Sequence, residues 1–278
     1  MNPTKAILLV AAILFSIGLN GQLCSGSPGD AIATINFGAG PNPGQPISNV
    51  PATYQYTSQD CPAEGFYTIR TETRFCFSNE WHVVAFDHSP NDPNGYLLLI
   101  NALAGPSLVY VDTITGLCGN TSFQVDAWLL NLRKPTACSG NGLDPSFILT
   151  VTDMTGAILG QKITGPLIEN DPVSWSLQNF LFTAPANGNV ILQITSLSTS
   201  GCGNEFAIDD ITFRPCGPSF SAAIGNNGPT QVSFCGSNPQ TLFMNTSYNG
   251  TYAHPIFQWQ TSNTQGFSWT DIPGENGQ

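Results

Sequence analysis

The sequence is short of charged residues, and of basic residues above all. Only 9% of its 278 residues are Asp, Glu, Lys or Arg, against about a quarter in an average soluble domain. Seven basic residues face eighteen acids, which gives a formal net charge of −11. Nucleic-acid binding needs clustered Lys and Arg to neutralise phosphates. The composition therefore argues against a nucleic-acid partner.

Long apolar runs are absent, with one exception at the start. Residues 6–19 are an almost unbroken apolar run that follows Lys5 and precedes small and polar residues. The run is too short for a membrane-spanning helix, which needs about 20 residues. This is the pattern of a secretory signal peptide, so we expect residues 1–21 to be removed. A lipid anchor at Cys24 is the less favoured alternative, because the bulky Leu23 precedes it.

Zinc-binding cysteine pairs are absent as well, since no two cysteines are separated by only two residues. In an exported chain the cysteines are then expected to form disulfides. The eight cysteines are at positions 24, 61, 76, 118, 138, 202, 216 and 235.

Turn-forming residues are abundant, with 28 Gly and 21 Pro. Between them, short alternating or β-branched segments predict ten to twelve strands, among them residues 75–86 and 121–132. The second of these places Phe123 and Val125 on one face and Asp126 and Trp128 on the other. We predict an all-β fold, with a jelly-roll β-sandwich over residues 22–216. Residues 217–278 are too few for an immunoglobulin-like β-sandwich of about 100 residues, so we expect an incomplete one there.

The spacing of the cysteines limits how they can pair. Cys61 and Cys76 are a natural local pair. Cys118 and Cys138 lie at opposite ends of the predicted strand 121–132, which spans roughly 30 Å or more at about 3.3 Å per residue. A disulfide needs Cα atoms within about 7 Å, so these two cannot bond to each other.

The same argument separates Cys202 from Cys216, which flank a predicted strand at 205–213. If the two long strands are antiparallel neighbours, Cys138 meets Cys202 at one end. Cys216 then lies at the other end, near Cys118 or Cys24. We expect the partner of Cys235 to lie in a missing C-terminal part.

Asp209 and Asp210 lie inside the apolar strand predicted at 205–213. Neighbouring strand residues face opposite sides, so one carboxylate is expected near the core, where an unpaired charge is costly. We predict a structural Ca²⁺ held by Asp210 and Asp209. The alternative is a strand-edge bulge with both acids hydrogen-bonded or solvated.

A second group of oxygen ligands is predicted in one loop. Asp87, Asp92 and Asn94 have a spacing that can bind Ca²⁺, although Asp-Pro-Asn-Gly is also an ordinary tight turn, which is the favoured interpretation. His82 and His88 flank this loop, and a transition-metal site there is the less favoured alternative to ordinary loop histidines.

Aromatic side chains are candidates for stacking on sugar rings. Trp128 is the best placed, because it lies on the face of its strand opposite Phe123 and Val125. Packing in the core is the alternative for each of them. The candidate ligand-binding residues are Trp128, Trp81, Tyr96, His82 and Trp175.

Several short motifs that occur together in one kind of module lie in three segments of the chain, at residues 76–96, 115–128 and 208–217. The motifs are Cys76-Phe77 with Trp81-His82, Asp87-His88 with Asp92-Pro93-Asn94-Gly95-Tyr96, Thr115-Gly116-Leu117-Cys118 with Ala127-Trp128, and Ile208-Asp209-Asp210-Ile211-Thr212-Phe213 before Pro215-Cys216-Gly217. Over residues 24–217 the chain resembles modules of large secreted surface proteins of gliding Bacteroidetes. The resemblance implies a jelly roll of the carbohydrate-binding and MAM type, often with a structural Ca²⁺ on an aspartate of the last strand. Trp259-Gln260 and Trp269-Thr270-Asp271 are similar to the immunoglobulin-like repeats that follow such modules.

No hydrolase motif such as Gly-x-Ser-x-Gly or His-Glu-x-x-His occurs, so we expect no enzymatic activity. The leading hypothesis is a secreted, non-catalytic adhesin module that binds a glycan or extracellular matrix and is stabilised by calcium. We expect its attachment to the cell surface through a missing C-terminal part. The alternatives are a spacer in a long surface fibre and an accessory domain of a secreted polysaccharide-degrading enzyme.

Overall fold

The structure is a computed structural model that describes residues 23–89, 91–199, 202–225, 243–249, 258–262, 264 and 267–274. The predicted signal peptide and Cys235 lie outside these residues. Within them, no helix has the length and apolar character that crossing a bilayer requires. The described chain is almost entirely β-structure, which confirms the predicted fold class.

Eleven strands and one short 3-10 helix make up the part of the described chain before residue 216. They are β1 (Ala33–Ile35), β2 (Gln55–Tyr56), β3 (Phe66–Arg70), β4 (Leu97–Asn101), β5 (Ser107–Ile114), β6 (Ser122–Asn131), η1 (Ala137–Gly140), β7 (Ser146–Thr152), β8 (Ile158–Pro166), β9 (Ser176–Thr183), β10 (Val190–Ser196) and β11 (Glu205–Pro215).

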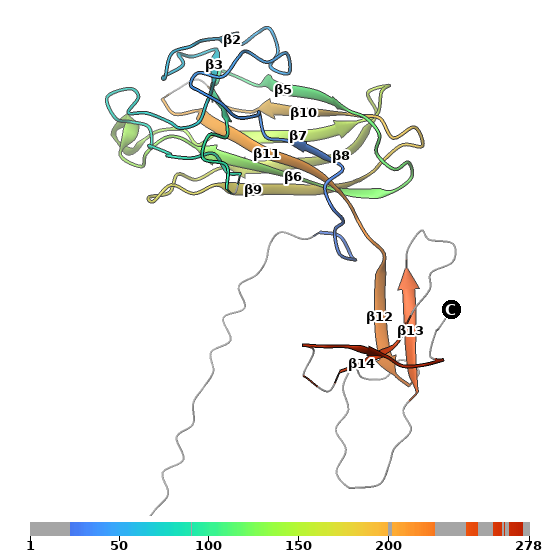
Figure 1. The fold of residues 1–278 in the computed structure, drawn as a ribbon. Helices are drawn as coiled ribbons and strands as arrows, with labels where there is room; N and C mark the ends of the chain where they lie inside the picture. Colours follow the sequence, from blue (N-terminus) through green and yellow to red (C-terminus); the bar gives the residue numbers. More distant parts are fainter. Residues whose placement is uncertain are drawn as a thin grey trace, which may run out of the picture.

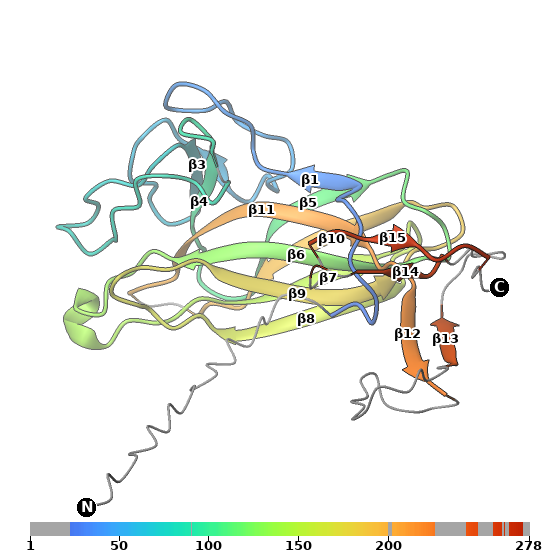
Figure 2. The same ribbon diagram turned by 60° about the horizontal axis from the view of Figure 1, so that its bottom comes forward.

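These strands form the two layers of a β-sandwich (Figure 1). One sheet has the order β2-β3-β4-β11-β6-β9, and β1 also pairs with β11. The other sheet has the order β5-β10-β7-β8. Two shorter strands pair with the same edge of the long strand β11. Strand β4 pairs with residues 205–208 and β1 with residues 211–213. Figure 2 shows β1 lying along β11 in this way.

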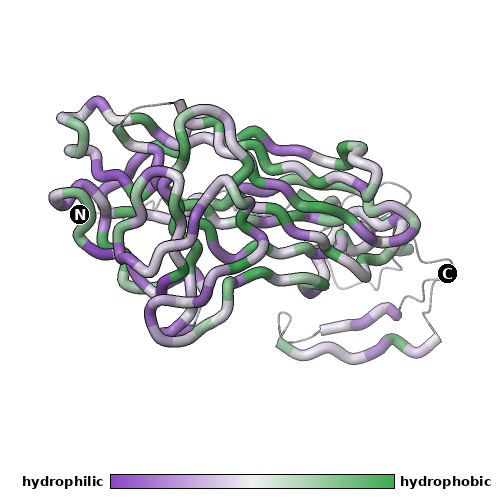
Figure 3. Tube along the Cα trace, turned by 90° about the horizontal axis from the view of Figure 1, so that it is seen from above, coloured by the Kyte–Doolittle hydropathy of each residue, from purple (hydrophilic) through white to green (hydrophobic). Residues whose placement is uncertain are grey.

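The main core lies between the two sheets and follows from the alternation of strands such as β6. In β6, Phe123, Val125, Ala127 and Leu129 are fully buried in it. Hydrophobic and hydrophilic residues alternate along much of the chain (Figure 3), whereas β4 is a continuous apolar run that is buried on both faces. Alternation with a period of two is what a sheet with one face in the core requires.

A second, smaller core lies on the outer face of the seven-stranded sheet. The long connection between β3 and β4 covers this face and buries Cys76 and Trp81 against Leu97, Leu130 and other sheet residues. Residues 75–86, predicted as a strand, are part of this connection and are not a strand. Phe77, Ser78 and Asn79 have φ between 49° and 72°, outside the β region, and the amide of Glu80 donates to the carbonyl of Cys76 at 3.0 Å. The segment therefore turns back on itself.

Three disulfides join distant parts of the sandwich. Cys61 bonds to Cys76 and Cys138 bonds to Cys202. Cys216 bonds to Cys24 across 192 residues of sequence, which settles the choice between Cys24 and Cys118. The pairing of Cys138 with Cys202 follows from the antiparallel contact of β6 and β11.

Beyond residue 216 the described chain contains two further hairpins. Strand β12 (Ser219–Ile224) pairs with β13 (Met244–Asn249), and β14 (Gln260–Thr261) pairs with β15 (Thr270–Asp271). An incomplete immunoglobulin-like domain at 217–278 stays a prediction, as does its boundary with the sandwich.

Candidate functional site

The sandwich has two outer faces, and most of the predicted site residues lie on one of them. On the seven-stranded sheet, register places Asp209 beside Trp128, and Thr212 beside Asp126. The side chains of Trp128 and Asp126 point away from the main core, because their neighbours Ala127 and Val125 point into it. The predicted acids and the best aromatic candidate therefore share this outer face.

A bulge separates the two adjacent aspartates of β11. The register with β6 shifts between Asp209 and Thr212, and Asp210 has a φ of 43°, in the left-handed region that non-glycine residues rarely adopt. Both carboxylates can therefore turn toward the same side of the sheet. This is the bulge that the sequence left open as an alternative.

Hydrogen bonds join both carboxylates to the covering connection. The Asp209 carboxylate accepts from the backbone amides of His88 and Asp210, at 2.7 and 2.8 Å. The Asp210 carboxylate lies 3.0 Å from His88 Nδ1 and accepts from the Ser89 hydroxyl at 2.7 Å. The pair thus fastens residues 88 and 89 to the sheet.

Burial dominates the titration of Asp209. The residue is fully buried, and burial raises its pKa to about 8, with only partial compensation from the amide hydrogen bond of His88. The neighbouring carboxylate of Asp210 and the carboxylate of Asp87 raise the pKa further. For Asp210, burial also opposes ionisation, but hydrogen bonds from His88 and Ser89 leave the pKa below its ordinary value.

Aromatic rings complete this attachment. The imidazole of His88 stacks on Trp128 with ring centroids 3.9 Å apart, and the edge of Trp175 meets it at 5.7 Å. One face of the Trp128 ring is therefore taken up by His88. Trp128, the best candidate for sugar stacking from the sequence, therefore uses at least this face of its ring to hold the β3–β4 connection.

The other predicted ligand-binding residues are packing residues. Trp81 belongs to the smaller core and Tyr96 to the main core, and His82 is also buried. The hydroxyl of Tyr96 donates to the carbonyl of Pro41 at 2.7 Å. None of the three rings is open to a ligand, because each is at most 8% exposed.

Asp87 is a buried acid whose carboxylate has no hydrogen bond of ordinary geometry. It is 8% exposed, and neither oxygen has a partner within hydrogen-bonding criteria. Burial raises its pKa, and Asp92 raises it further, while nearby Ser89 opposes the shift. A Cβ at Gly95 would collide with the Asp87 carboxylate and lie 3.0 Å from Cγ of Asp92. The two acids therefore converge over a position that only glycine leaves open.

The loop that carries Asp92 and Asn94 also forms the turn that the sequence favoured. The amide of Gly95 donates to the carbonyl of Asp92 at 3.1 Å. Asn94 is exposed, and its carbonyl accepts from the amide of Gly40 at 3.0 Å. The turn and a cation site at Asp87 and Asp92 are compatible, because the turn uses backbone atoms only.

Within the described residues, one group brings three potential ligand atoms within 4.8 Å of one another. It contains Glu80, Cys138 and Cys202. The two cysteine sulfurs are bonded to each other, so this group is a carboxylate beside a disulfide and not a metal site. Any cation at Asp87, Asp92 and Asp210 would have to draw their oxygens closer together.

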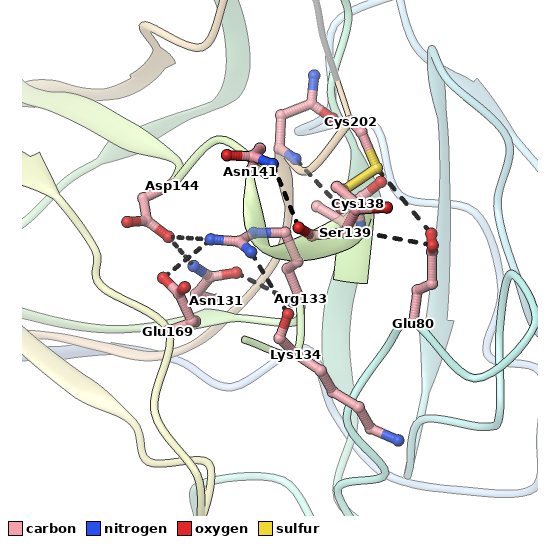
Figure 4. Close-up of a disulfide and its surroundings, with 12 residues drawn as sticks. Glu80, Asn131, Arg133, Lys134, Cys138, Ser139, Asn141, Asp144, Glu169 and Cys202 are labelled. Carbon is pink, nitrogen blue, oxygen red and sulfur yellow. Dashed lines mark hydrogen bonds and ion pairs between the residues drawn. A yellow bond between two sulfur atoms is a disulfide. The ribbon is translucent and has the colours of Figure 1, made fainter. Parts of the chain in front are cut away.

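The surroundings of that disulfide contain a buried ion pair (Figure 4). The guanidinium of Arg133 is 2.9 Å from both Asp144 and Glu169, and the Arg133 side chain is 2% exposed. The side-chain amide of Asn131 donates to Asp144 at 2.9 Å. Burial raises the pKa of Asp144, whereas a hydrogen bond from Asp144 lowers that of Glu169. Because Arg133 contacts both acids, the cluster fastens together the loops that carry Asp144 and Glu169.

The outer face of the four-stranded sheet has a different character. Its residues alternate with the core residues of the same strands, such as Leu149 and Leu192. Three rows cross the strands in the order β5, β10, β7, β8, and none of the twelve positions carries a charge. The rows are Thr113, Ile191, Thr152 and Ile158; Val111, Gln193, Thr150 and Gln161; and Leu108, Thr195, Ile148 and Ile163. We refer to these twelve residues as the uncharged sheet face.

This face is partly open and rich in hydrogen-bonding groups. Ile158 and Ile163, on the edge strand, are 63% and 60% exposed, whereas Thr150 and Thr152 on the neighbouring strand are buried. The Gln161 amide donates to the hydroxyl of Thr150 at 3.1 Å, so the polar side chains are ordered by one another. Aromatic residues were the binding candidates predicted from the sequence, and none of them lies on this face. The alternation Ile191, Gln193, Thr195 in β10 is the signal that could have shown it.

Comparisons with known proteins show only partial likenesses. No family model and no characterised protein sequence matches the chain. Among solved structures, the enzymatically active domain of bacteriophage CBA120 tailspike protein 4 is 11% identical with a TM-score of 0.33, over 54% of this chain and 17% of that one. The CBM22-1–GH10 modules of Clostridium thermocellum xylanase 10B, complexed with xylohexaose, are 17% identical with a TM-score of 0.28, over 45% and 22%.

A structure titled as a CBM4 module is 11% identical with a TM-score of 0.26, over 54% of this chain and 70% of that one. The chain thus spans about a fifth of the length of the first two structures. These likenesses are too partial to identify a ligand for this chain.

Proposed function

We propose that the β-sandwich is a non-catalytic module that binds a neutral glycan across the uncharged sheet face. The observation that carries this proposal is the composition of that face, which combines amides and hydroxyls with aliphatic side chains and has no charge. A neutral sugar offers hydroxyl groups and apolar C–H surface, so it matches both kinds of side chain. Charged side chains would keep their own water and compete with it.

The spacing of the middle row supports an extended chain lying across the strands. Gln193, Thr150 and Gln161 stand on three adjacent strands. Neighbouring strands are about 4.8 Å apart, which is close to the rise of one pyranose unit in an extended chain. Gln193 and Gln161 would therefore each meet a sugar, while Thr150 between them is 9% exposed and orients Gln161. Ile148 and Ile163 of the next row lie beside them.

The wider role that we propose is an adhesin module of an exported, cell-surface protein. Three disulfides within the described residues fit an oxidising, extracytoplasmic environment. A module with an uncharged face on an acidic body, at a net charge of −11, would bind uncharged surfaces and repel anionic ones. A spacer in a surface fibre is the competing role.

The test is binding of the exported chain to a panel of immobilised neutral and acidic polysaccharides. We expect retention on at least one neutral polysaccharide and loss of retention in Gln193→Ala with Gln161→Ala. The matched control is Gln55→Ala, because Gln55 is exposed and lies on β2 of the other sheet. If the chain is retained on no polysaccharide, the spacer role is favoured. If the control loses retention equally, binding does not depend on this face.

We further propose that Ca²⁺ stabilises the module at Asp87 and Asp92, with Asp210 as a third ligand. The unpartnered oxygens of Asp87 are the observation that fits a hard cation. Asp209 is less suited as a ligand, because both of its oxygens accept hydrogen bonds from backbone amides. The partners of Asp210 are the side chains of His88 and Ser89, which can turn away from a bound cation. This shifts the predicted site from the strand toward the covering connection.

Thermal unfolding with Ca²⁺ and with a chelator tests the metal, since a ligand that binds the native state raises stability. We expect Ca²⁺ to raise Tm in the native chain and to have no effect on Asp87→Asn. If Asp87 is instead a buried acid that binds no metal, we expect the opposite result. In that case Ca²⁺ leaves Tm unchanged, and Asp87→Asn is the more stable protein because it removes the cost of burying a carboxyl group.

A further inference from the structure

Exposed large hydrophobic side chains gather on the covering connection between β3 and β4. Within twelve residues, Phe75, Phe77, Val83 and Phe86 are 72%, 43%, 42% and 64% exposed. A soluble chain places single apolar residues on its surface without consequence, but a cluster of them marks a contact surface. We call these four residues the apolar tip.

The apolar tip is the outward side of a turned-back segment whose other side is anchored. The amide of Thr73 donates to the carbonyl of Val84 at 2.9 Å, so the two limbs of the segment run side by side. Cys76, Trp81 and Val84 point inward and pack on the sheet. Cys76 is also disulfide-bonded to Cys61. The outward residues therefore stand on a rigid base.

Two of the few basic residues flank the tip. Arg74 pairs with Glu72 and its side chain is 55% exposed. Lys134 Nζ lies 5.9 Å above the ring of Phe75, and its hydrogen-bonding partner is the neutral amide oxygen of Asn79. The chain has only seven basic residues in all, so two of them beside one apolar cluster give this tip a less acidic setting than the body.

We propose that the apolar tip inserts into a lipid surface, with Lys134 at the level of the headgroup phosphates. Four side chains on one segment are too few for a stable protein interface, which buries about 800 Å² on each partner. Insertion into a bilayer needs only a few apolar side chains and a nearby cation. Phe and Val also carry no polar group that would stay unsatisfied in hydrocarbon.

Co-sedimentation of the exported chain with vesicles tests this proposal. The probe is phosphatidylcholine vesicles with and without one fifth phosphatidylglycerol. We expect binding to both through the apolar side chains, and weaker binding to the anionic vesicles at low salt, because the net charge of −11 repels them. Phe75→Ser with Phe86→Ser should lower the partition coefficient at least about tenfold, because burying an aromatic side chain is worth about one such factor or more.

The matched control is Ile168→Ser, since Ile168 is 63% exposed on the connection between β8 and β9 and should leave vesicle binding unchanged. Both proteins should keep the Tm of the native chain, because the exchanged side chains are exposed. No binding of the native chain to either vesicle overturns the proposal. Unchanged binding in the double variant overturns it as well. A native dimer that the double variant turns into a monomer, measured by sedimentation velocity, would assign the tip to protein contact instead.

Discussion

The two outer faces of the sandwich differ in their charge and in how far the rest of the chain covers them. The seven-stranded sheet carries acids on its outer face, namely Asp126 and the pair at the bulge, and it is partly covered by the β3–β4 connection. The four-stranded sheet carries no charge on the twelve positions of its outer face. Charge therefore lies where hydrogen-bonding groups of the same chain can reach it.

The difference follows from what each face must do physically. A carboxylate under a covering loop is tolerated only if donors accompany it, and the amides and side chains of His88 and Ser89 supply them. A face that binds a ligand needs groups whose desolvation costs little free energy. Thr and Gln give up water more readily than Asp or Arg, so the uncharged sheet face is the better candidate for binding and the acidic one for structure.

The largest effect that we predict concerns the covered face. Trp81→Ala should lower the free energy of unfolding by about 3–5 kcal/mol, because Trp81 is 1% exposed in the smaller core and its removal leaves a cavity. Urea unfolding measures this loss. If the loss were below about 1 kcal/mol, the connection would be a loosely attached loop and the contrast between the faces would fail.

The next effect is a dependence of stability on pH. The pKa of Asp209 rises from 3.8 to about 8 on folding, so the native state holds a proton that the unfolded chain releases between these values. The free energy of unfolding should therefore fall as pH rises from 3.8 to about 8, by an amount on the order of a few kcal/mol. Urea unfolding in chelator at pH 5 and pH 8 measures it.

The variant Asp209→Asn tests whether Asp209 causes this dependence of stability on pH. An amide does not titrate, so the decline with pH should flatten, while the native stability at pH 5 drops by about 1–3 kcal/mol because the amide nitrogen cannot accept a backbone hydrogen bond. Asp87, Asp126, Asp144 and Glu205 also have raised pKa values, so part of the slope should persist. An unchanged slope would mean that Asp209 does not titrate in this range and that the other four acids account for the decline.

The sequence was informative wherever one local pattern decides the structure. Alternation in residues 121–132 predicted β6 and its core face, since a sheet with one buried side tolerates no other pattern. The reach of a strand separated Cys118 from Cys138. By contrast, residues 75–86 have strand-like composition, yet they turn at Phe77–Asn79 because the disulfide and Trp81 anchor the segment from its inward side. That anchoring depends on partners distant in sequence.

The candidate site was harder to predict for the same reason. The sequence marked Asp209 and Asp210 through an apolar strand that contains two acids, but their donors come from residues 88 and 89, about 120 positions earlier. Trp128 looked free because nothing local showed that His88 would stack on it. The uncharged sheet face requires the register of four strands, which no single strand reveals.

The smallest effect on stability, and the sharpest test of the contrast, comes from placing one charge on the open face. Ile163→Glu should change the free energy of unfolding by no more than about 0.5 kcal/mol, because the side chain is 60% exposed and reaches water from an edge strand. Retention on the neutral polysaccharide should nevertheless fall strongly, since the carboxylate keeps its water beside Thr195 and Ile148 of the same row. Ile168→Glu, on the connection beyond β8, is the control with equal exposure and should leave retention intact. Equal retention by both variants would mean that a charge is tolerated on this face, and its lack of charge would then have no bearing on binding.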